Sequence, residues 1–163
     1  MPRLSVSEIV SVIGSYENLL SQMERFLYTP PRSRCSMSWR GKALGGSPKF
    51  LMKGATFYGV DARELLWCIT FGRDRLPEYG WLYRLCDKPR CMDMEHVFVG
   101  PPGLSRTLGR MKKDGFPAGL FVLNGMWQPD PELLAEYRRI VRNRRAVSSR
   151  QRVVLPRVPK ARA

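Results

Sequence analysis

Histidine, cysteine and long apolar runs are scarce in this sequence. It contains one histidine and four cysteines, and no apolar run approaches the ~20 residues that a membrane span needs. Residues 1–20 have no cationic stretch followed by an uninterrupted apolar one, which argues against a secretion signal. We therefore expect neither a transmembrane nor a secreted protein, but one that works in a reducing intracellular compartment such as the cytoplasm, nucleoid or organelle matrix.

Acidic residues are missing from the C-terminal end. The chain of 163 residues carries 28 Lys+Arg against 14 Asp+Glu, a net charge of +14. Residues 137–163 contain ten basic residues and no acidic one, so the first 136 residues carry only +4. Neither a solubilising surface nor a GC-rich genome explains why acidic residues are missing from this one segment. A membrane is disfavoured as the partner because the tail has no aromatic anchors.

This charge distribution predicts nucleic acid as the partner, either duplex DNA or structured RNA. Arginine outnumbers lysine 21 to 7, and its planar guanidinium favours contacts with phosphates and base edges. The arginines of this segment that we predict to bind nucleic acid are Arg138, Arg139, Arg142, Arg144, Arg145, Arg150 and Arg152.

Apolar spacing and turn residues predict an α+β fold with a small antiparallel sheet. A capping box at Ser5–Glu8 begins an amphipathic helix that should run to about Leu27. The other predicted helices are 62–71, 104–113 and one that begins at Pro131. The predicted strands are 37–39, 50–52, 56–58, 81–85 and 97–99, and 116–127 is predicted as a further strand or turn pair. The expected core residues are Trp39, Leu65, Leu66, Trp67, Trp81 and Phe98.

The cysteines and the histidine have the spacing of metal ligands. Cys86, Cys91 and His96 place two thiolates and an imidazole within eleven residues, on a segment expected to form strand, turn and strand. A structural zinc site takes four such ligands. Cys35 and Cys68 are both available as the fourth; Cys35 lies in a polar, turn-rich stretch, which favours it over Cys68 in a predicted core helix. The alternative is that these are ordinary buried cysteines and His96 is a surface residue.

The segment WLYRLCDKPRCMDMEHVFVGPPGLSRTLGRMKKDG resembles the HNH endonucleases of phages and introns and the related His-Cys box homing endonucleases. The shared pattern is H-x-C-D-N-P-x-C-x-N-P-x-H-L, followed by G-T and by an Asn several residues into a helix. Cys35-x3-Trp39-x-Gly41 also matches, so the resemblance covers about residues 35–115. It implies a ββα-metal fold, a zinc set of Cys35, Cys86, Cys91 and His96, and dimers among the homing members. The N- and C-terminal helices predicted above would flank this unit.

The residues that would cleave nucleic acid in this family are replaced here. The family's catalytic histidine falls on Arg84, which stays protonated and cannot take a proton from water. The Asn that holds Mg²⁺ falls on Ser105, a poor sole ligand for that ion. Arg84 would instead be a phosphate contact. Asp93 and Glu95 are the possible substitutes if the protein does use Mg²⁺ for cleavage.

These observations give a domain plan and three hypotheses. We expect an N-terminal helix and linker at 1–34, the HNH-like unit at 35–115, a strand and helix region at 116–146 and a basic extended tail at 147–163.

The first hypothesis is a non-catalytic nucleic-acid-binding protein, either a DNA-binding regulator or a component of a ribonucleoprotein such as a ribosome. The second is an active metal-dependent endonuclease. The third is a structural or protein-interaction role with the tail as an address signal.

Overall fold

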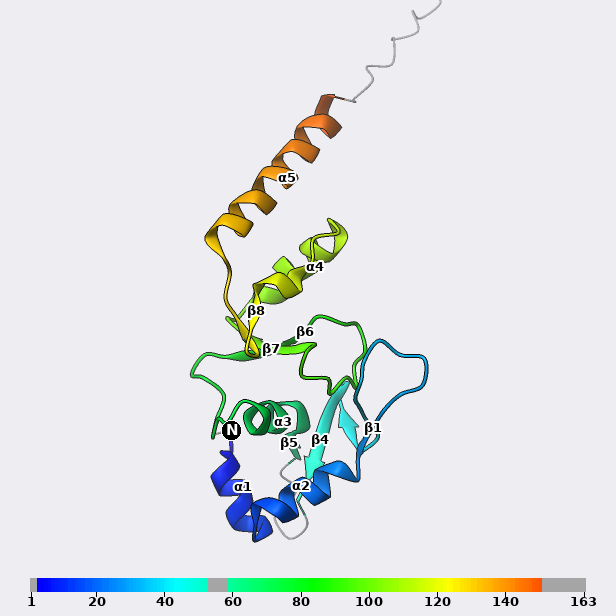
Figure 1. Ribbon diagram of the computed structural model, residues 1–163, viewed down its shortest axis with the longest axis vertical. Coiled ribbons are helices and arrows are strands. Elements are labelled where there is room, and N and C mark those ends of the chain that lie inside the picture. The colour runs from blue at the N-terminus through cyan, green and yellow to red at the C-terminus, as the bar shows by residue number, and fades with distance from the viewer. Residues whose placement is uncertain (1–2, 53–58, 151–163) are drawn as a thin grey trace, which may run out of the picture. The chain divides into compact units, whose positions relative to one another are not determined.

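The structure is a computed structural model that describes residues 3–52 and 59–150, and the side chains of 148–150 are not described. It is an α+β fold, as the sequence predicts (Figure 1). The chain forms two compact units, Met1–Gln128 and Pro129–Ala163. The helices of the described ranges are α1 (Val6–Ile13), α2 (Tyr16–Glu24), α3 (Ala62–Thr70), α4 (Leu104–Lys113) and α5 (Pro131–Arg150), with a 3-10 helix η1 (Ala118–Phe121). The strands are β1 (Leu27–Tyr28), β2 (Ser38–Trp39), β3 (Ala43–Leu44), β4 (Ser47–Leu51), β5 (Gly59–Asp61), β6 (Trp81–Arg84), β7 (Val97–Gly100), β8 (Val122–Leu123) and β9 (Met126–Trp127).

The N-terminal segment forms two helices, so the prediction of one helix to Leu27 is wrong. The capping box is present: Ser5 and Glu8 bond to each other's backbone N–H, and α1 then ends at Gly14 with φ +100°. Ser15 begins α2 by accepting a hydrogen bond from the Asn18 amide at 3.1 Å. The apolar spacing continues across this break because both helices bury their apolar side chains in the same core.

Within the described residues, the strands form three small sheets instead of one. β1 pairs with β2, β3–β4–β5 form the second sheet, and β6–β7–β9–β8 form the third. All of these pairs are antiparallel except β7 with β9, which is parallel. Residues 116–127 therefore form η1, β8 and β9, and they extend the sheet that holds the β6–β7 hairpin. The strand predicted at 56–58 lies outside the described residues.

β7 is an internal strand of the third sheet and is buried along its whole length. Val97 and Val99 pack with Trp67 of α3, whereas Phe98 stacks on Trp127 at 5.9 Å between ring centroids. Side chains alternate between the faces of a strand, so apolar residues at every position mean that both faces are covered. Trp81, which we expected in the core, lies on the neighbouring edge strand β6 and is 56% exposed.

The N-terminal helices complete a core under β4 and α3. Four of the predicted core residues, Trp39, Leu65, Trp67 and Phe98, are 0–2% exposed, and Leu66 is half-buried against this core. Residues 1–34 thus share a core with the segment 35–115. The buried members of the cluster are Ile9, Leu19, Met23, Trp39, Phe50, Met52, Ala62, Leu65 and Met92.

The C-terminal unit is built on α5. Asp130 begins the helix by accepting a hydrogen bond from the Glu132 amide at 2.8 Å, and Pro131 occupies the first helical position, as predicted. The helix continues to Arg150, so residues 147–150 are helical and not part of an extended tail. Among residues 3–52 and 59–150, no helix combines the length and the apolar character that a membrane crossing requires.

Candidate metal centre and the cleft beside it

The structure brings Cys35, Cys86, Cys91 and His96 together. One ligand atom from each of these residues lies within 4.8 Å of the ligand atoms of the other three. Cys35 Sγ lies 3.7 Å from Cys86 Sγ, and Cys91 Sγ lies 3.7 Å from His96 Nδ1. Cys35 and Cys91 are buried, and the other two are half-buried. The four residues can therefore hold a metal ion between them, which confirms the predicted grouping.

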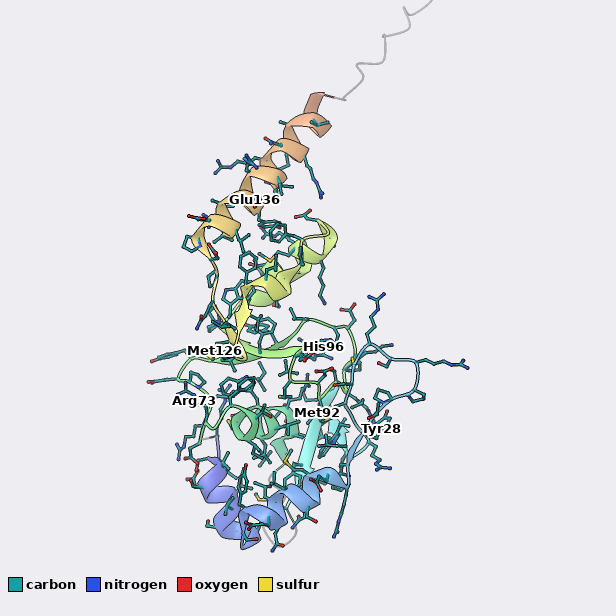
Figure 2. All side chains as sticks on the ribbon, viewed as in Figure 1. Tyr28, Arg73, Met92, His96, Met126 and Glu136 are labelled. Atoms are coloured by element: carbon teal, nitrogen blue, oxygen red, sulfur yellow. The ribbon has the colours of Figure 1, made fainter. Side chains whose placement is uncertain are left out.

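Two loops carry these ligands, and backbone hydrogen bonds hold the loops against each other. Cys86 follows β6, and His96 stands where the chain enters β7 (Figure 2). The Leu85 amide donates to the His96 carbonyl at 2.8 Å, which closes the base of the β6–β7 loop. Cys91 forms an isolated antiparallel bridge with Ser38 of β2, and this bridge brings the loop that contains Cys35 next to the other three ligands.

Asp93 also holds the loop of Cys35 in place. Its Oδ2 accepts hydrogen bonds from the Ser36 amide and hydroxyl, both at 2.8 Å, and its Oδ1 accepts from the Glu95 amide at 3.0 Å. Burial alone would raise the pKa of Asp93, but these hydrogen bonds and nearby His96 lower it below its ordinary value. Asp93 is therefore a structural carboxylate, and Glu95 is exposed to solvent.

The four cysteines fall into two classes. All are free thiols, and the 3.7 Å between Cys35 and Cys86 is far longer than the ~2.05 Å of a disulfide. Burial raises the pKa of Cys91, and the neighbouring thiols of Cys86 and Cys35 raise it further. Thiols crowded in this way become stable thiolates when a metal ion supplies the positive charge. Cys68 instead lies in the apolar cluster around Trp67, where burial raises its pKa to about 12.

A cleft lies between β6 and α4, next to Cys86. Its lining contains Arg84 and Ser105, the two positions at which the sequence departs from the endonuclease pattern. The cleft has a volume of about 570 Å³, which is in the usual range for a ligand site. Asp93 and Glu95, the possible catalytic substitutes, are not among its lining residues; the carboxylates that line it are Asp61 and Asp87.

Arg63 is the cleft residue whose role the sequence did not predict. Its side chain is nearly buried, at 8% exposed, and Nη2 donates to Ser47 Oγ at 3.3 Å. Within the described ranges, Arg63 Nε is buried without a hydrogen-bond partner. Burial lowers the pKa of Arg63, the charge of Arg84 lowers it further, and Asp61 opposes both effects. Its position two residues after the helix cap Asp61 could have drawn attention to it, because a cation is unfavourable in a first helical turn.

Arg84 and Lys112 complete the basic side of the cleft. Arg84 Nη1 donates to the Lys88 carbonyl, which holds the guanidinium beside the β6–β7 loop. Lys112 of α4 forms an ion pair with Asp87, with Nζ and Oδ1 2.8 Å apart. The Asp87 side chain is 92% exposed, so this pair stands at the mouth of the cleft and is screened by water.

The arginines predicted to bind nucleic acid lie mainly on α5. Arg138, Arg142 and Arg145 follow one another at four- and three-residue spacing, which places them on one face of the helix. They are exposed, as are Arg139 and Arg144. Arg150 is the last residue of α5, and Arg152 lies outside the described residues.

Comparison with known proteins identifies no relative. No family model, no curated protein and no solved structure matches the chain. The function is therefore inferred from the chain's own residues: a Cys3His cluster, a basic cleft beside it and an arginine-rich helix.

Proposed function

We propose that this protein binds nucleic acid without cleaving it, on a degenerate scaffold of the HNH endonuclease type that a structural zinc ion stabilises. The observation that carries this proposal is the position of the only histidine in the chain, His96, inside the cysteine cluster. The chain therefore has no second imidazole that could act as the base of an HNH nuclease. The adjoining cleft presents two arginines, Arg63 and Arg84, in its place.

The ligand set and its spacing support zinc as the metal. Three thiolates and one imidazole are a common tetrahedral donor set for structural zinc, whereas Mg²⁺ and Ca²⁺ prefer oxygen. Zn–S and Zn–N bonds of about 2.3 and 2.0 Å imply S···S and S···N edges of about 3.8 and 3.5 Å in a regular tetrahedron. The Cys35–Cys86 and Cys91–His96 separations are each 3.7 Å, close to these values, and all separations within the group are at most 4.8 Å.

The order of elements supports the resemblance to HNH endonucleases. β6 and β7 form an antiparallel hairpin, and α4 follows three residues after β7 ends. This is the strand, strand and helix order that a ββα-metal unit requires. Arg84 at the end of β6 and Ser105 in the first turn of α4 line one cleft, as the two chemical positions of such a unit should.

The carboxylates of the cleft are engaged in ways that do not favour cleavage. Asp61 caps α3 by accepting from the amides of Arg63 and Glu64, and its other oxygen lies 3.8 Å from Lys49 Nζ. Asp87 is paired with Lys112. A nuclease needs a metal ligand and a base near the phosphate. Asp61 is engaged as a helix cap and Asp87 lies 92% exposed in a pair screened by water, so these two carboxylates do not favour either role.

The arginines of α5 supply the binding energy in this proposal. Each guanidinium that neutralises a phosphate releases a condensed counterion, so affinity depends steeply on salt. Exposed arginines on one face of a helix of about 30 Å can follow the phosphates along a groove edge. Contacts of this kind position the protein without reading sequence.

Binding and cleavage can be measured on the same sample. Full-length protein with zinc is titrated into labelled duplex DNA and a labelled RNA hairpin, with Mg²⁺ or Mn²⁺ present, and the strands are then sized on a denaturing gel. We expect binding of at least one of the two and strands of unchanged length. Loss of full-length strands that Asp87→Asn or Asp93→Asn abolishes would establish the active endonuclease instead. No binding to either polymer at low salt would refute the proposal.

A further inference from the structure

We propose that a groove between the two loops that carry the metal ligands binds an unpaired stretch of nucleic acid, with one base against the ring of Tyr28. The groove lies between loop 29–37, which contains Cys35, and loop 85–96, which contains the other three ligands. Its volume of about 860 Å³ is in the range of ligand sites. It shares Cys86 and Asp87 with the cleft between β6 and α4, and the rest of its lining is its own. The proposal rests on the proposed function for the class of polymer.

Both walls of the groove carry positive charge. The lining includes four exposed basic residues, two from each loop: Arg32, Arg34, Lys88 and Arg90. Within residues 3–52 and 59–150, none of the three arginines forms an ion pair. The opposing negative charge is smaller, because a zinc ion with three thiolates and a neutral imidazole has a net charge of about −1. Asp87 also lines the groove, but it is paired with Lys112. The balance favours an anionic ligand.

The backbone of loop 85–96 is held in place, which leaves its basic side chains to contact a ligand. The Arg90 carbonyl accepts from the Trp39 amide at 3.0 Å and from Ser38 Oγ at 3.1 Å. The Lys88 carbonyl accepts from the Cys91 amide at 3.2 Å. A metal ion in the cluster would join this loop to loop 29–37. A surface that is ordered before binding loses little conformational entropy on binding, which favours affinity.

Arg32 has a backbone conformation that suits glycine better than arginine. Its φ is +55°, in the left-handed region that residues with a Cβ atom seldom occupy. Folding alone would therefore favour glycine at this turn. A strained residue whose exposed, charged side chain lines a groove supports a role in binding.

Tyr28 gives the groove an aromatic surface. It is the last residue of β1, is 39% exposed and lines the groove together with Pro30 and Pro31 (Figure 2). Neighbouring base pairs cover the faces of the bases in a duplex, so a protein ring can stack only on a base that is unpaired. A positively charged groove with an aromatic ring is the usual combination for binding a single strand. The chain's own C-terminal end does not suit the groove, because residues 151–163 include basic residues and no acidic one.

The test compares single strands with a duplex, using matched variants of the full-length, zinc-loaded protein. The probes are labelled oligothymidine and oligouridine of about twelve nucleotides and a blunt duplex of that length. The groove variant combines three substitutions: Arg32→Gln, Arg34→Gln and Arg90→Gln. Its control removes as much charge from exposed arginines of the body outside the groove: Arg73→Gln, Arg106→Gln and Arg110→Gln. Tyr28→Leu is matched by Tyr16→Leu, since the two residues are 39% and 41% exposed.

The groove variant should bind the single strands about ten-fold or more weakly than its control, because it loses contacts with the phosphates. Tyr28→Leu should weaken their binding by about five-fold or more, the effect of one lost base stack, and change duplex binding by less than about two-fold. Arg32→Gly should weaken single-strand binding by about two-fold or more. It should leave the melting temperature unchanged or raise it, because glycine adopts the left-handed conformation without strain.

The outcomes separate this proposal from the one it rests on. If the wild type binds nucleic acid and the groove variant loses no more affinity than its control, the groove site is overturned and the proposed function stands. If Tyr28→Leu has no larger effect than Tyr16→Leu, the assignment to an unpaired base is overturned. If the groove variant loses its zinc or fails to fold, Arg32→Gly and Tyr28→Leu decide. If the wild type binds none of the probes, both proposals fail. Binding of polyglutamate by that wild type, lost in the groove variant, would then assign the groove to an acidic peptide.

Discussion

The body, Met1–Gln128, and the helix α5 differ in how acidic residues accompany their basic residues. In the body, basic side chains pair with acids: Arg75 with Glu8 at 3.2 Å, Lys112 with Asp87 at 2.8 Å and Lys49 with Asp61 at 3.8 Å. In α5, the two acids Glu132 and Glu136 precede all of the arginines, and none follows. We infer from this difference that the body supplies stability and that α5 supplies most of the affinity for an anionic polymer.

The largest expected effect is the loss of a metal ligand in the body. Cys91 is fully buried, and Cys91→Ser should remove the ion and destabilise the fold by ~3 kcal/mol or more, because metal binding contributes directly to folding. Urea unfolding and metal analysis of the purified protein measure both consequences. Cys68→Ala is the control, since that thiol lies in the apolar cluster and should leave the metal content unchanged. If the Cys91→Ser protein kept its full metal content, the inference that this metal site stabilises the body would be contradicted.

The second effect concerns α5 and should leave stability untouched. The triple change of Arg138, Arg142 and Arg145 to Gln should weaken nucleic-acid binding by about 10–100-fold near physiological salt and reduce the slope of log K against log salt by about 2–3. All three side chains are exposed, so the melting temperature should stay within a degree or two of the wild type. Fluorescence anisotropy and thermal unfolding measure the two quantities. An unchanged affinity would show that α5 is not the binding element.

The third effect distinguishes the two carboxylates that follow Cys91. Asp93→Ala leaves the amides of Ser36 and Glu95 without their acceptor, which should cost about 1–3 kcal/mol in the free energy of unfolding. It should also weaken metal binding by about ten-fold or more, because it loosens the loop of Cys35. Glu95→Ala is the control, since that side chain is exposed and its effect should stay within about 0.5 kcal/mol. Equal effects of the two changes would contradict the structural role of Asp93.

The smallest effect is expected at the edge of the body. Trp81 is 56% exposed on β6, so Trp81→Thr keeps a residue that suits a strand and should change the free energy of unfolding by less than about 1 kcal/mol. Denaturant unfolding monitored by circular dichroism measures it. A loss of about 3 kcal/mol, typical of a buried tryptophan, would mean that Trp81 belongs to the core after all.

Local signals in the sequence predicted α3, α4 and the metal ligands well. α4 has the predicted bounds, and α3 ends one residue earlier than predicted, because Asp61 caps it and apolar residues recur at helical spacing. The polar surroundings of Cys35 favour it over Cys68 as the fourth ligand, and the structure places Cys35 with the other ligands. In these cases the neighbouring residues in the sequence determine where a helix begins or ends and whether a cysteine lies in polar or apolar surroundings.

Other features depend on contacts between distant segments, and the sequence predicted them poorly. The parallel pairing of β7 with β9 needs the chain to return past α4, which no local pattern encodes. The sequence predicts Trp81 as a core residue, but its exposure depends on β6 being an edge strand. The burial of Arg63 likewise depends on segments distant in sequence, because it bonds to Ser47 of β4 and lines a cleft with residues of β6 and α4.

The salt dependence of nucleic-acid binding tests the central claim most directly. The affinity of the full-length, zinc-loaded protein for duplex DNA and for an RNA hairpin is measured by anisotropy from about 50 to 300 mM salt. If three or more arginines contact phosphates, log K should fall with log salt with a slope of about −3 or steeper for at least one polymer. A slope near zero for both, or no binding at the lowest salt, would contradict the account.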